Sequence, residues 1–480
     1  MHIGLDIGTS AIKAMLVNSR LEPLTSASIA LSVSRPHPGW SEQVPQDWLS
    51  AVDEAMLALC QTHPDDMASV SSIGLSGQMH GLVALDNKGT PLRPAILWND
   101  VRSAVEANEL DETQPLFREI GGNAVMPGFT APKALWMARH EPELFDQIST
   151  IMLPKDYVRF WLSGEKYSDP SDASGTLWLD IARRDWDNQL LAACHLSRAH
   201  MPALAEGSKA AGTLKPAWAK RWGIKGDVVI AGAGDNAAAA CGLGIVSPGD
   251  GFISLGTSGV VFAVTDRFAP APDNGAHAFC HALPNLWHQM GVILSATDSL
   301  NWLSEIVSKP VPELAKAAAA IALDHDSPLL FHPYLSGERT PHNDAAAKGG
   351  FFGLSRTDGV PEMAFAVLEG VAFAIADCVD VLRAAGSTPT RFLATGGGAK
   401  NAQWLQMIAD MIGVEIALPV AGDFGAALGA ARLGALANGR DQRELLTQPE
   451  IAHSFGPDRK RASYYAARHR KWQTLYHAVR

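Results

Sequence analysis

The segment LDIGTSAIKAMLV, which begins at residue 5, is echoed by ISLGTSGVVFAV at residues 253–264. In each copy, two runs of strand-forming residues flank the same Gly-Thr-Ser triplet, which predicts a hairpin of two strands. A motif that returns after roughly half of the chain indicates two domains of similar design. The Pro- and Gly-rich segment 244–251 lies between the copies, and we therefore expect domains at residues 1–245 and 246–480.

The composition agrees with two globular domains, because 480 residues are too many for one hydrophobic core. The net charge of −11 argues against nucleic acid or an anionic membrane as the main partner. The N-terminal residues lack a long apolar run, and no stretch approaches the length of a membrane span, so we expect neither a signal peptide nor a membrane helix. Five scattered cysteines without CxxC spacing indicate a reducing, cytoplasmic location.

The two Gly-Thr-Ser loops are candidates for binding phosphate. A glycine-led turn can direct consecutive N–H groups and two hydroxyls toward one anion. Each loop alone would more often be an ordinary turn, but a pair at corresponding positions of two domains favours phosphate held from both sides of a cleft. In the first hairpin, Asp6 shares a strand face with Gly4 and Gly8, where a phosphate or substrate could approach the backbone closely. The candidate phosphate-binding residues of this hairpin are Thr9, Ser10 and Lys13.

Several other segments have clear local patterns. We expect a strand, a bend and a strand at 72–86, a long buried helix at 361–382, a strand, a triple-glycine turn and a helix at 391–413, a helix of small residues at 425–436, and a basic, solvated amphipathic helix in the tail RKRASYYAARHRKW. The triple glycine in TGGGAKN could lie flat against a base or a ribose, or could form a strained turn. It is not a Walker loop, because GxxxxGK[ST] occurs nowhere in the chain.

Two segments could contact a small polar ligand. The bend SGQMHG places Gln78, Met79 and His80 together, and small polyols are held by a few directed hydrogen bonds against an apolar floor. Trp98 in LWND is typical of sugar sites, although a lone His or Trp is more often structural. The segment HAFCHALPNLWH (277–288) contains three histidines and a cysteine, but their spacing matches no standard zinc motif, so we expect a strand and a loop there.

Asp235 and Asn236 stand in the run AGAGDNAAAACG, which predicts a strand, a tight turn and an Ala-rich helix. Asp235 could cap that helix, belong to a variant of the dinucleotide-binding fingerprint, or act as a base in a cleft. The fingerprint is the weakest alternative, because no strand ends in an acidic residue about twenty positions further on. A helix N-terminus would help to keep the Asp235 carboxyl ionised at neutral pH, so a cap and a base are compatible.

These motifs resemble those of the FGGY carbohydrate kinases. GGFFGLSRTDGVPEMAFAVLEGVAF fits the C-terminal signature of that family, and MPGFTAPKALWMARHEP fits the N-terminal one except at Ala134, where a larger apolar residue is usual. The segments SRPHPGWSEQ, GQMHG, RPAILWNDVR, LPKDYVR, SDASGT and YLSGERTPHN are similar to the bacterial xylulokinase group within the family. Glycerol kinases carry Arg-Glu where Met79 and His80 stand, which favours a ketopentose over glycerol.

The resemblance implies an α/β fold of two actin-like, ribonuclease H-like domains, each a mixed sheet flanked by helices, with a catalytic cleft between them. It implies ATP-dependent phosphorylation of D-xylulose to D-xylulose 5-phosphate. Asp235 matches the general base, and Asp6 matches an aspartate that organises Mg²⁺ through water. Carried over in the same way are the sugar contacts Met79, His80 and Asn236, the phosphate contacts Gly256 and Thr257, and the nucleoside contacts Gly397, Gly398 and Asn401.

Three alternatives remain open at this stage. A kinase for another ketopentose or polyol, similar to the ribulokinases, would keep the same chemistry. An actin-like ATPase would need no sugar site, and a dinucleotide-dependent dehydrogenase would need to bind NAD(H). For the leading interpretation we expect D-xylulose and ATP as partners, with a homodimer as one expected assembly.

Overall fold

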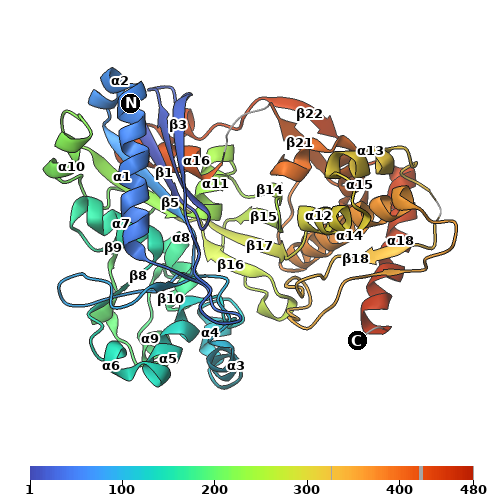
Figure 1. Cartoon of the computed structure of the whole chain (residues 1–480), viewed down its shortest axis with the longest axis horizontal. Coiled ribbons are helices and arrows are strands. Elements are labelled where there is room, and N and C mark those ends of the chain that lie inside the picture. Colours follow the sequence, from blue (N-terminus) through green and yellow to red (C-terminus); the bar gives the residue numbers. More distant parts are fainter. Residues whose placement is uncertain (326, 421–424, 479–480) are drawn as a thin grey trace.

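Two mixed β-sheets form the centres of the two lobes in the computed structural model, which describes residues 1–325, 327–420 and 425–478 (Figure 1). The first sheet has the order β13-β5-β1-β2-β3, and the second has the order β16-β17-β15-β14-β20-β21-β22. The strands of the first sheet are β1 (His2–Ile7), β2 (Ala11–Val17), β3 (Pro23–Ala30), β5 (Ser72–Gly77) and β13 (Val229–Gly234). Those of the second are β14 (Asp250–Leu255), β15 (Gly259–Thr265), β16 (His277–Cys280), β17 (Trp287–Ile293), β20 (Arg391–Thr395), β21 (Glu415–Pro419) and β22 (Ile451–Phe455).

The two sheets share one topology, which confirms the repeat found in the sequence. In the first sheet, β13, β5 and β1 are parallel, and β2 and β3 continue antiparallel. In the second sheet, β21, β20 and β14 are parallel, and β15 and β17 continue antiparallel. Each Gly-Thr-Ser triplet joins the equivalent pair of strands, β1 to β2 and β14 to β15. The predicted fold of two similar α/β domains is therefore confirmed.

The period-two pattern of the first strand sets its two faces. Ile3, Leu5 and Ile7 are fully buried on one face, where they join a core with residues of α1 (Pro45–Thr62) and α7 (Pro154–Ser163). The opposite face is kept almost bare by Gly4, which allows a helix backbone to approach.

That helix is α16 (Ala426–Ala437), which comes from the second half of the sequence and packs against the first sheet and against α11 (Asp235–Leu243). A Cβ atom on Gly4 would lie 1.8 Å from the carbonyl oxygen of Ala427, and one on Gly74 would lie 1.6 Å from that of Ala430. The division at residue 245 stays a proposal: the strands of the two sheets fall on either side of it, whereas α16 lies with the first sheet.

The other predicted elements are confirmed with one correction. They are β5 with β6 (Val83–Leu85), α14 (Val360–Ala384), β20 with the short helix η4 (Gly397–Lys400) and α15 (Ala402–Ile412), and α16. The basic tail forms α18 (Arg459–Ala478), but one face of this helix is buried rather than solvated. Its Trp472 is almost fully buried and donates a hydrogen bond to the carbonyl oxygen of Phe331 at 2.7 Å. No helix in the described ranges combines the length and the apolar character needed to cross a membrane.

The contact between α16 and the first sheet gives a stability prediction. Gly74→Ala places a methyl group inside a backbone contact that cannot yield cheaply, so we expect a loss of about 3 kcal/mol of unfolding free energy and a clear fall in melting temperature. Gly456→Ala is the control, because nothing lies within 4 Å of its Cβ position. Equal melting temperatures for the two variants would contradict the packing described here.

Candidate active site

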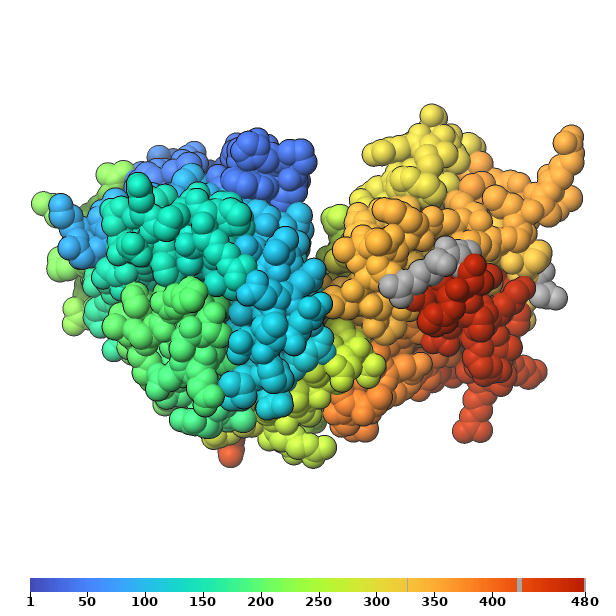
Figure 2. Space-filling model, turned by 90° about the horizontal axis from the view of Figure 1, so that it is seen from below, coloured from blue at the N-terminus to red at the C-terminus, as the bar shows by residue number. Residues whose placement is uncertain are grey.

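A cavity of about 280 Å³ lies between the two lobes, where Figure 2 shows an indentation separating them. Both lobes line it. The first lobe contributes Met79, His80, Trp98, Phe129, Asp235 and Asn236, and the second contributes Ser258, Val260, His277, Phe279 and Arg339. Five of the residues predicted to bind substrate are thus brought together. They come from segments that are far apart in the chain, near residues 80 and 98 and near residue 235.

The carboxyl-terminal edge of the first sheet carries the two acidic residues of interest. Asp6, near the end of β1, is in register with Ser76 of β5, which in turn pairs with Ala233 of β13, two residues before Asp235. Two strand spacings separate β1 from β13, so the backbones at Asp6 and Ala233 lie about 10 Å apart, and Asp235 follows two residues later. Ligands bind in the crevice outside this edge in open α/β sheets.

Asp235 is the first residue of α11 and not its N-cap. Gly234 holds the cap position without a side-chain hydrogen bond, so the cap interpretation of Asp235 is wrong. The Oδ1 atom of Asp235 accepts hydrogen bonds from the backbone N–H of Asn236 at 2.7 Å and from its Nδ2 at 3.0 Å. The carboxyl group is therefore oriented by its neighbour, and one oxygen remains for a ligand.

Burial raises the pKa of Asp235 to about 7, and the negative charge of Asp6 adds to this, while the hydrogen bonds from Asn236 oppose it. The sequence led us to expect that the helix N-terminus would help to keep this group ionised, and burial acts in the opposite direction. Burial also raises the pKa of Asp6, against a 3.0 Å hydrogen bond from Ser76 Oγ and the charge of Lys13. A cation between the two carboxylates would lower the pKa of both groups.

The strand that leads to Asp235 is held from behind by α8 (Pro170–Ala173). The backbone N–H of Gly234 donates to Ser171 Oγ at 3.1 Å, and Ser171 Oγ donates to Asp169. A Cβ atom on Gly234 would lie 3.4 Å from the Cα atom of Asp172. The start of α11, and with it Asp235, is thus fixed by a short chain of buried contacts.

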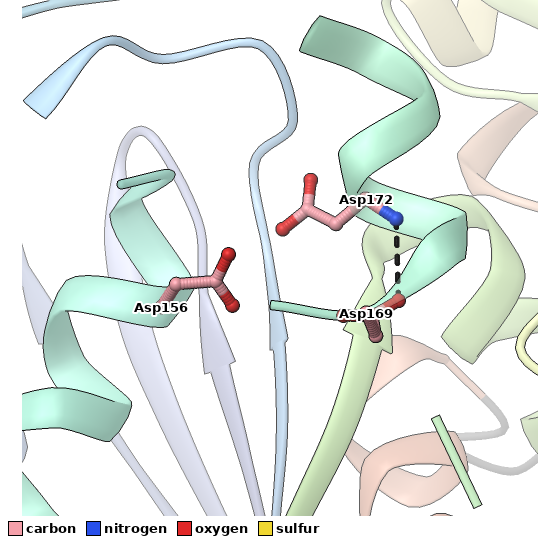
Figure 3. A group of neighbouring side chains, drawn as sticks. All are labelled: Asp156, Asp169 and Asp172. Carbon is pink, nitrogen blue, oxygen red and sulfur yellow. Dashed lines mark hydrogen bonds between the residues drawn. The ribbon is translucent and has the colours of Figure 1, made fainter. Parts of the chain in front are cut away.

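Asp169 belongs to a buried ion cluster, which we define as Asp156, Asp169, Asp172, Lys155 and Arg159. Figure 3 shows the three carboxylates, which lie close enough together to resemble a metal site. However, the ammonium group of Lys155 lies 2.5 Å from Asp156, 2.6 Å from Asp169 and 3.1 Å from Asp172. The lysine supplies the cation, so we interpret the cluster as structural. Sequence analysis missed it, although all five members fall within residues 155–172.

His80 is held as a neutral hydrogen-bond acceptor. Its Nδ1 lies 2.8 Å from the carbonyl oxygen of Gly175, so Nδ1 carries the proton and Nε2 is left with a lone pair. Burial lowers the pKa of His80 to about 3. The residue has a φ of +68°, and a Cβ atom on Gly175 would lie 2.5 Å from its ring. This strained and crowded position aims the imidazole at the cavity.

Gln78 lies behind the cavity rather than in its lining. Its Nε2 donates to Gln43 Oε1 at 3.0 Å, and its Oε1 accepts from Thr9 Oγ1 at 2.9 Å. Trp98 Nε1 donates to the same Thr9 oxygen at 3.0 Å. The first Gly-Thr-Ser loop is therefore tied to the floor of the cavity through Thr9, while Ser10 at its tip is exposed.

A second hollow of about 680 Å³ in the second lobe brings together Gly397, Gly398 and Asn401. Its other wall is largely apolar and comes from α12 (Thr297–Val307) and α13 (Val311–Ala319), mainly Leu300, Val311, Pro312, Ala315 and Ala319. No atom lies within 4 Å of the Cβ position of Gly397, so its backbone is open to a flat ligand. The second Gly-Thr-Ser loop lies beside this hollow and is held by two backbone hydrogen bonds. Ala296 N–H donates to the carbonyl oxygen of Thr257 at 2.8 Å, and Thr297 N–H donates to that of Gly256 at 3.0 Å.

Comparisons with known proteins agree with this architecture. The models of the FGGY family of carbohydrate kinases match residues 1–242 (N-terminal domain) and 251–438 (C-terminal domain). The chain is 49% identical over 479 residues to a xylulose kinase of Escherichia coli K12, covering 99% of this chain and 98% of that protein.

Solved structures give the same result. A protein of Brucella ovis described as a xyloylose kinase has a TM-score of 0.96 and 49% identity, with 100% of this chain and 99% of that one covered. A gluconate kinase of Lactobacillus acidophilus has a TM-score of 0.93 at 26% identity, with 99% and 97% covered. The fold therefore does not by itself identify the sugar.

The buried ion cluster gives a second prediction. Lys155→Met removes its central cation, and we expect a loss of about 3–5 kcal/mol of unfolding free energy at neutral pH, because buried carboxylates are left without their partner. Urea unfolding would measure this loss, which should shrink at low pH as the carboxyl groups take up protons.

Lys220→Met is the control for that variant, since Lys220 is an exposed lysine on another helix, α10 (Pro216–Arg221). Equal stability of the two variants would show that the cluster does not depend on its lysine.

Proposed function

Because the chain belongs to the FGGY family of carbohydrate kinases, we propose that it transfers the terminal phosphoryl group of ATP to D-xylulose, giving D-xylulose 5-phosphate. The observation that carries this proposal is that Asp235 from the first lobe and Ser258 from the second Gly-Thr-Ser loop line one cavity. A base for the sugar hydroxyl and a loop suited to phosphate thus face the same space. The name of the E. coli relative supports the choice of sugar.

In this proposal, Asp235 accepts the proton of the attacking hydroxyl as the new O–P bond forms. Phosphoryl transfer needs in-line positioning and charge stabilisation more than covalent chemistry. His80 accepts a hydrogen bond from the sugar through Nε2, Asn236 orients Asp235 and reaches the cavity, and Met79 and Trp98 supply apolar walls. The direct sugar contact predicted for Gln78 stays a prediction; its position supports a role in holding Thr9.

We place the nucleotide against the second lobe. Gly397, Gly398 and Asn401 would receive the nucleoside in the larger hollow, and Gly256 and Thr257 would hold the terminal phosphates. Thr9, Ser10 and Lys13 approach these phosphates from the first lobe. Closure of the two lobes would exclude water and so limit wasteful hydrolysis of ATP.

The residues present fit a divalent cation such as Mg²⁺. Asp6 and Asp235 border the same edge of the sheet, and burial raises the pKa of both. Asp6 would hold the ion through water, and a bound Mg²⁺ would neutralise charge on the phosphate oxygens. Hard oxygen ligands of this kind are the ones that Mg²⁺ prefers.

We also propose a cytoplasmic location, which the unpaired state of all five cysteines supports. A homodimer stays a prediction that light scattering would test.

A panel of sugars tests the proposed function. With ATP, we expect turnover with D-xylulose to exceed that with D-ribulose, glycerol and D-gluconate by at least about tenfold. We expect Asp235→Asn to lose about a thousandfold or more in kcat while it still binds ATP. ADP release in a coupled assay measures both. Equal rates on every sugar would defeat the choice of D-xylulose, and ATP turnover that no sugar accelerates would favour an actin-like ATPase.

The pH profile tests the role of Asp235 separately. A base must be ionised, and burial raises the pKa of this group in the free enzyme to about 7, so kcat/KM for D-xylulose should fall about tenfold per pH unit below that value and level off above it. Initial rates at limiting D-xylulose from pH 5 to 9 measure the profile. A rate that stays constant down to pH 5 would rule out Asp235 as the titrating base.

A further inference from the structure

The second lobe places two polar side chains in the sugar cavity that the assignments above leave without a role. They are His277, on β16, and Arg339, in the loop after β18 (Leu330–His332). Sequence analysis considered His277 only as a metal ligand and Arg339 only as part of the segment YLSGERTPHN. Neither interpretation explains why both line the cavity that holds Asp235 and His80.

His277 presents a hydrogen-bond acceptor. Its Nδ1 lies 3.1 Å from Asn123 Oδ1, and Asn123 Nδ2 donates to the carbonyl oxygens of Gly121 and Ala278 at 2.8 and 3.0 Å. The Asn123 oxygen is therefore the acceptor, so His277 carries its proton on Nδ1 and a lone pair on Nε2. His277 is 3% exposed, and its Nε2 is buried without a partner among the described residues. A buried acceptor of this kind is costly unless a ligand satisfies it.

Arg339 presents only donors. Its guanidinium group makes no hydrogen bond or ion pair with any residue that the structure describes, and Glu338 beside it is engaged with the backbone N–H groups of Leu294 and Arg339 at 3.0 and 2.7 Å. Arg339, His80 and His277 line the same cavity. The charge of Arg339 lowers the pKa of His277 after burial, and it lowers that of His80 after burial and the charge of Lys133.

Aromatic rings hold the two histidines in fixed planes. Phe129 makes edge contacts with His80 at 4.7 Å and with His277 at 5.7 Å, and Phe279 stacks on His277 at 5.5 Å between ring centroids. The cavity thus offers two neutral acceptors and one cationic donor in a rigid apolar frame. Sugar hydroxyl groups can donate to the acceptors, and hydroxyl or carbonyl oxygens can accept from the arginine.

We propose that His277 and Arg339 bind the sugar directly and determine sugar specificity, with His277 Nε2 accepting from a hydroxyl group and Arg339 donating to a sugar oxygen. This proposal rests on the proposed function. It makes the sugar a bridge between the lobes, since His80 and Asp235 belong to the first lobe and His277 and Arg339 to the second. Sugar binding then draws together the lobes that carry the base and the nucleotide.

The test compares His277→Phe with His288→Phe. His288 is also a buried histidine, on the neighbouring strand β17, and its ring stacks on Phe262 at 4.3 Å, but it does not line the cavity. We expect His277→Phe and Arg339→Met each to raise the KM for D-xylulose at least tenfold and to leave the KM for ATP within about twofold. His288→Phe should leave both constants within about twofold.

Sugar analogues identify the contact. One D-xylulose analogue lacking a single hydroxyl group should bind wild type and His277→Phe equally well, because the group that His277 recognises is already absent. Arg339→Lys should recover part of the loss seen in Arg339→Met.

The inference is overturned if both variants match His288→Phe in sugar KM while the wild type phosphorylates D-xylulose. It is also overturned if they raise the KM for ATP instead, which would place both residues at the phosphates. If the wild type phosphorylates no ketopentose, the proposed function fails instead. Efficient turnover of D-gluconate would then indicate that Arg339 binds the carboxylate of that substrate.

Discussion

Asp235 is a carboxylate in a desolvated position between two lobes, and the surrounding structure depends on keeping it there. Its orientation comes from Asn236, and its position comes from the Gly234 N–H, which is bonded to Ser171 and through it to the buried ion cluster. Desolvation gives the group a pKa near 7, suited to accepting a proton at neutral pH. A more exposed carboxylate would be too weak a base, and a cavity without one would offer no route for the hydroxyl proton.

Small residues make this arrangement possible. Gly4 and Gly74 let α16 lie against the backbone of the first sheet, and Gly429 lets it lie against α11, where a Cβ atom would be 1.7 Å from the carbonyl oxygen of Ala238. The chain therefore leaves the first lobe after α11 and returns to it through α16. These contacts brace the helix that begins at Asp235 from its far side. The Ala-rich sequence around Asp235 serves backbone packing as much as access for a substrate.

Local patterns were sufficient to predict much of the fold, because strand alternation, glycine turns and the repeated Gly-Thr-Ser triplet are short-range signals. They led to both hairpins and to the helix that begins at Asp235. The ion cluster and the roles of His277 and Arg339 could not be found in this way. A lysine becomes buried, or a histidine nitrogen is left without a hydrogen-bond partner, only when segments that are distant in the sequence pack together. The same is true of Gln78, whose hydrogen-bond partners Gln43 and Thr9 come from other segments. The raised pKa of Asp235 could not be predicted either, because burial is a property of the fold.

The most direct test of the account is a crystal structure of the protein with D-xylulose and a non-hydrolysable ATP analogue. The account predicts that the Asp235 carboxylate lies within hydrogen-bond distance, about 2.6–3.2 Å, of the terminal sugar hydroxyl, with the last phosphate of the analogue in line beyond that oxygen. A sugar bound outside the cavity between the lobes, or a terminal hydroxyl that Asp235 reaches neither directly nor through one water molecule, would contradict it.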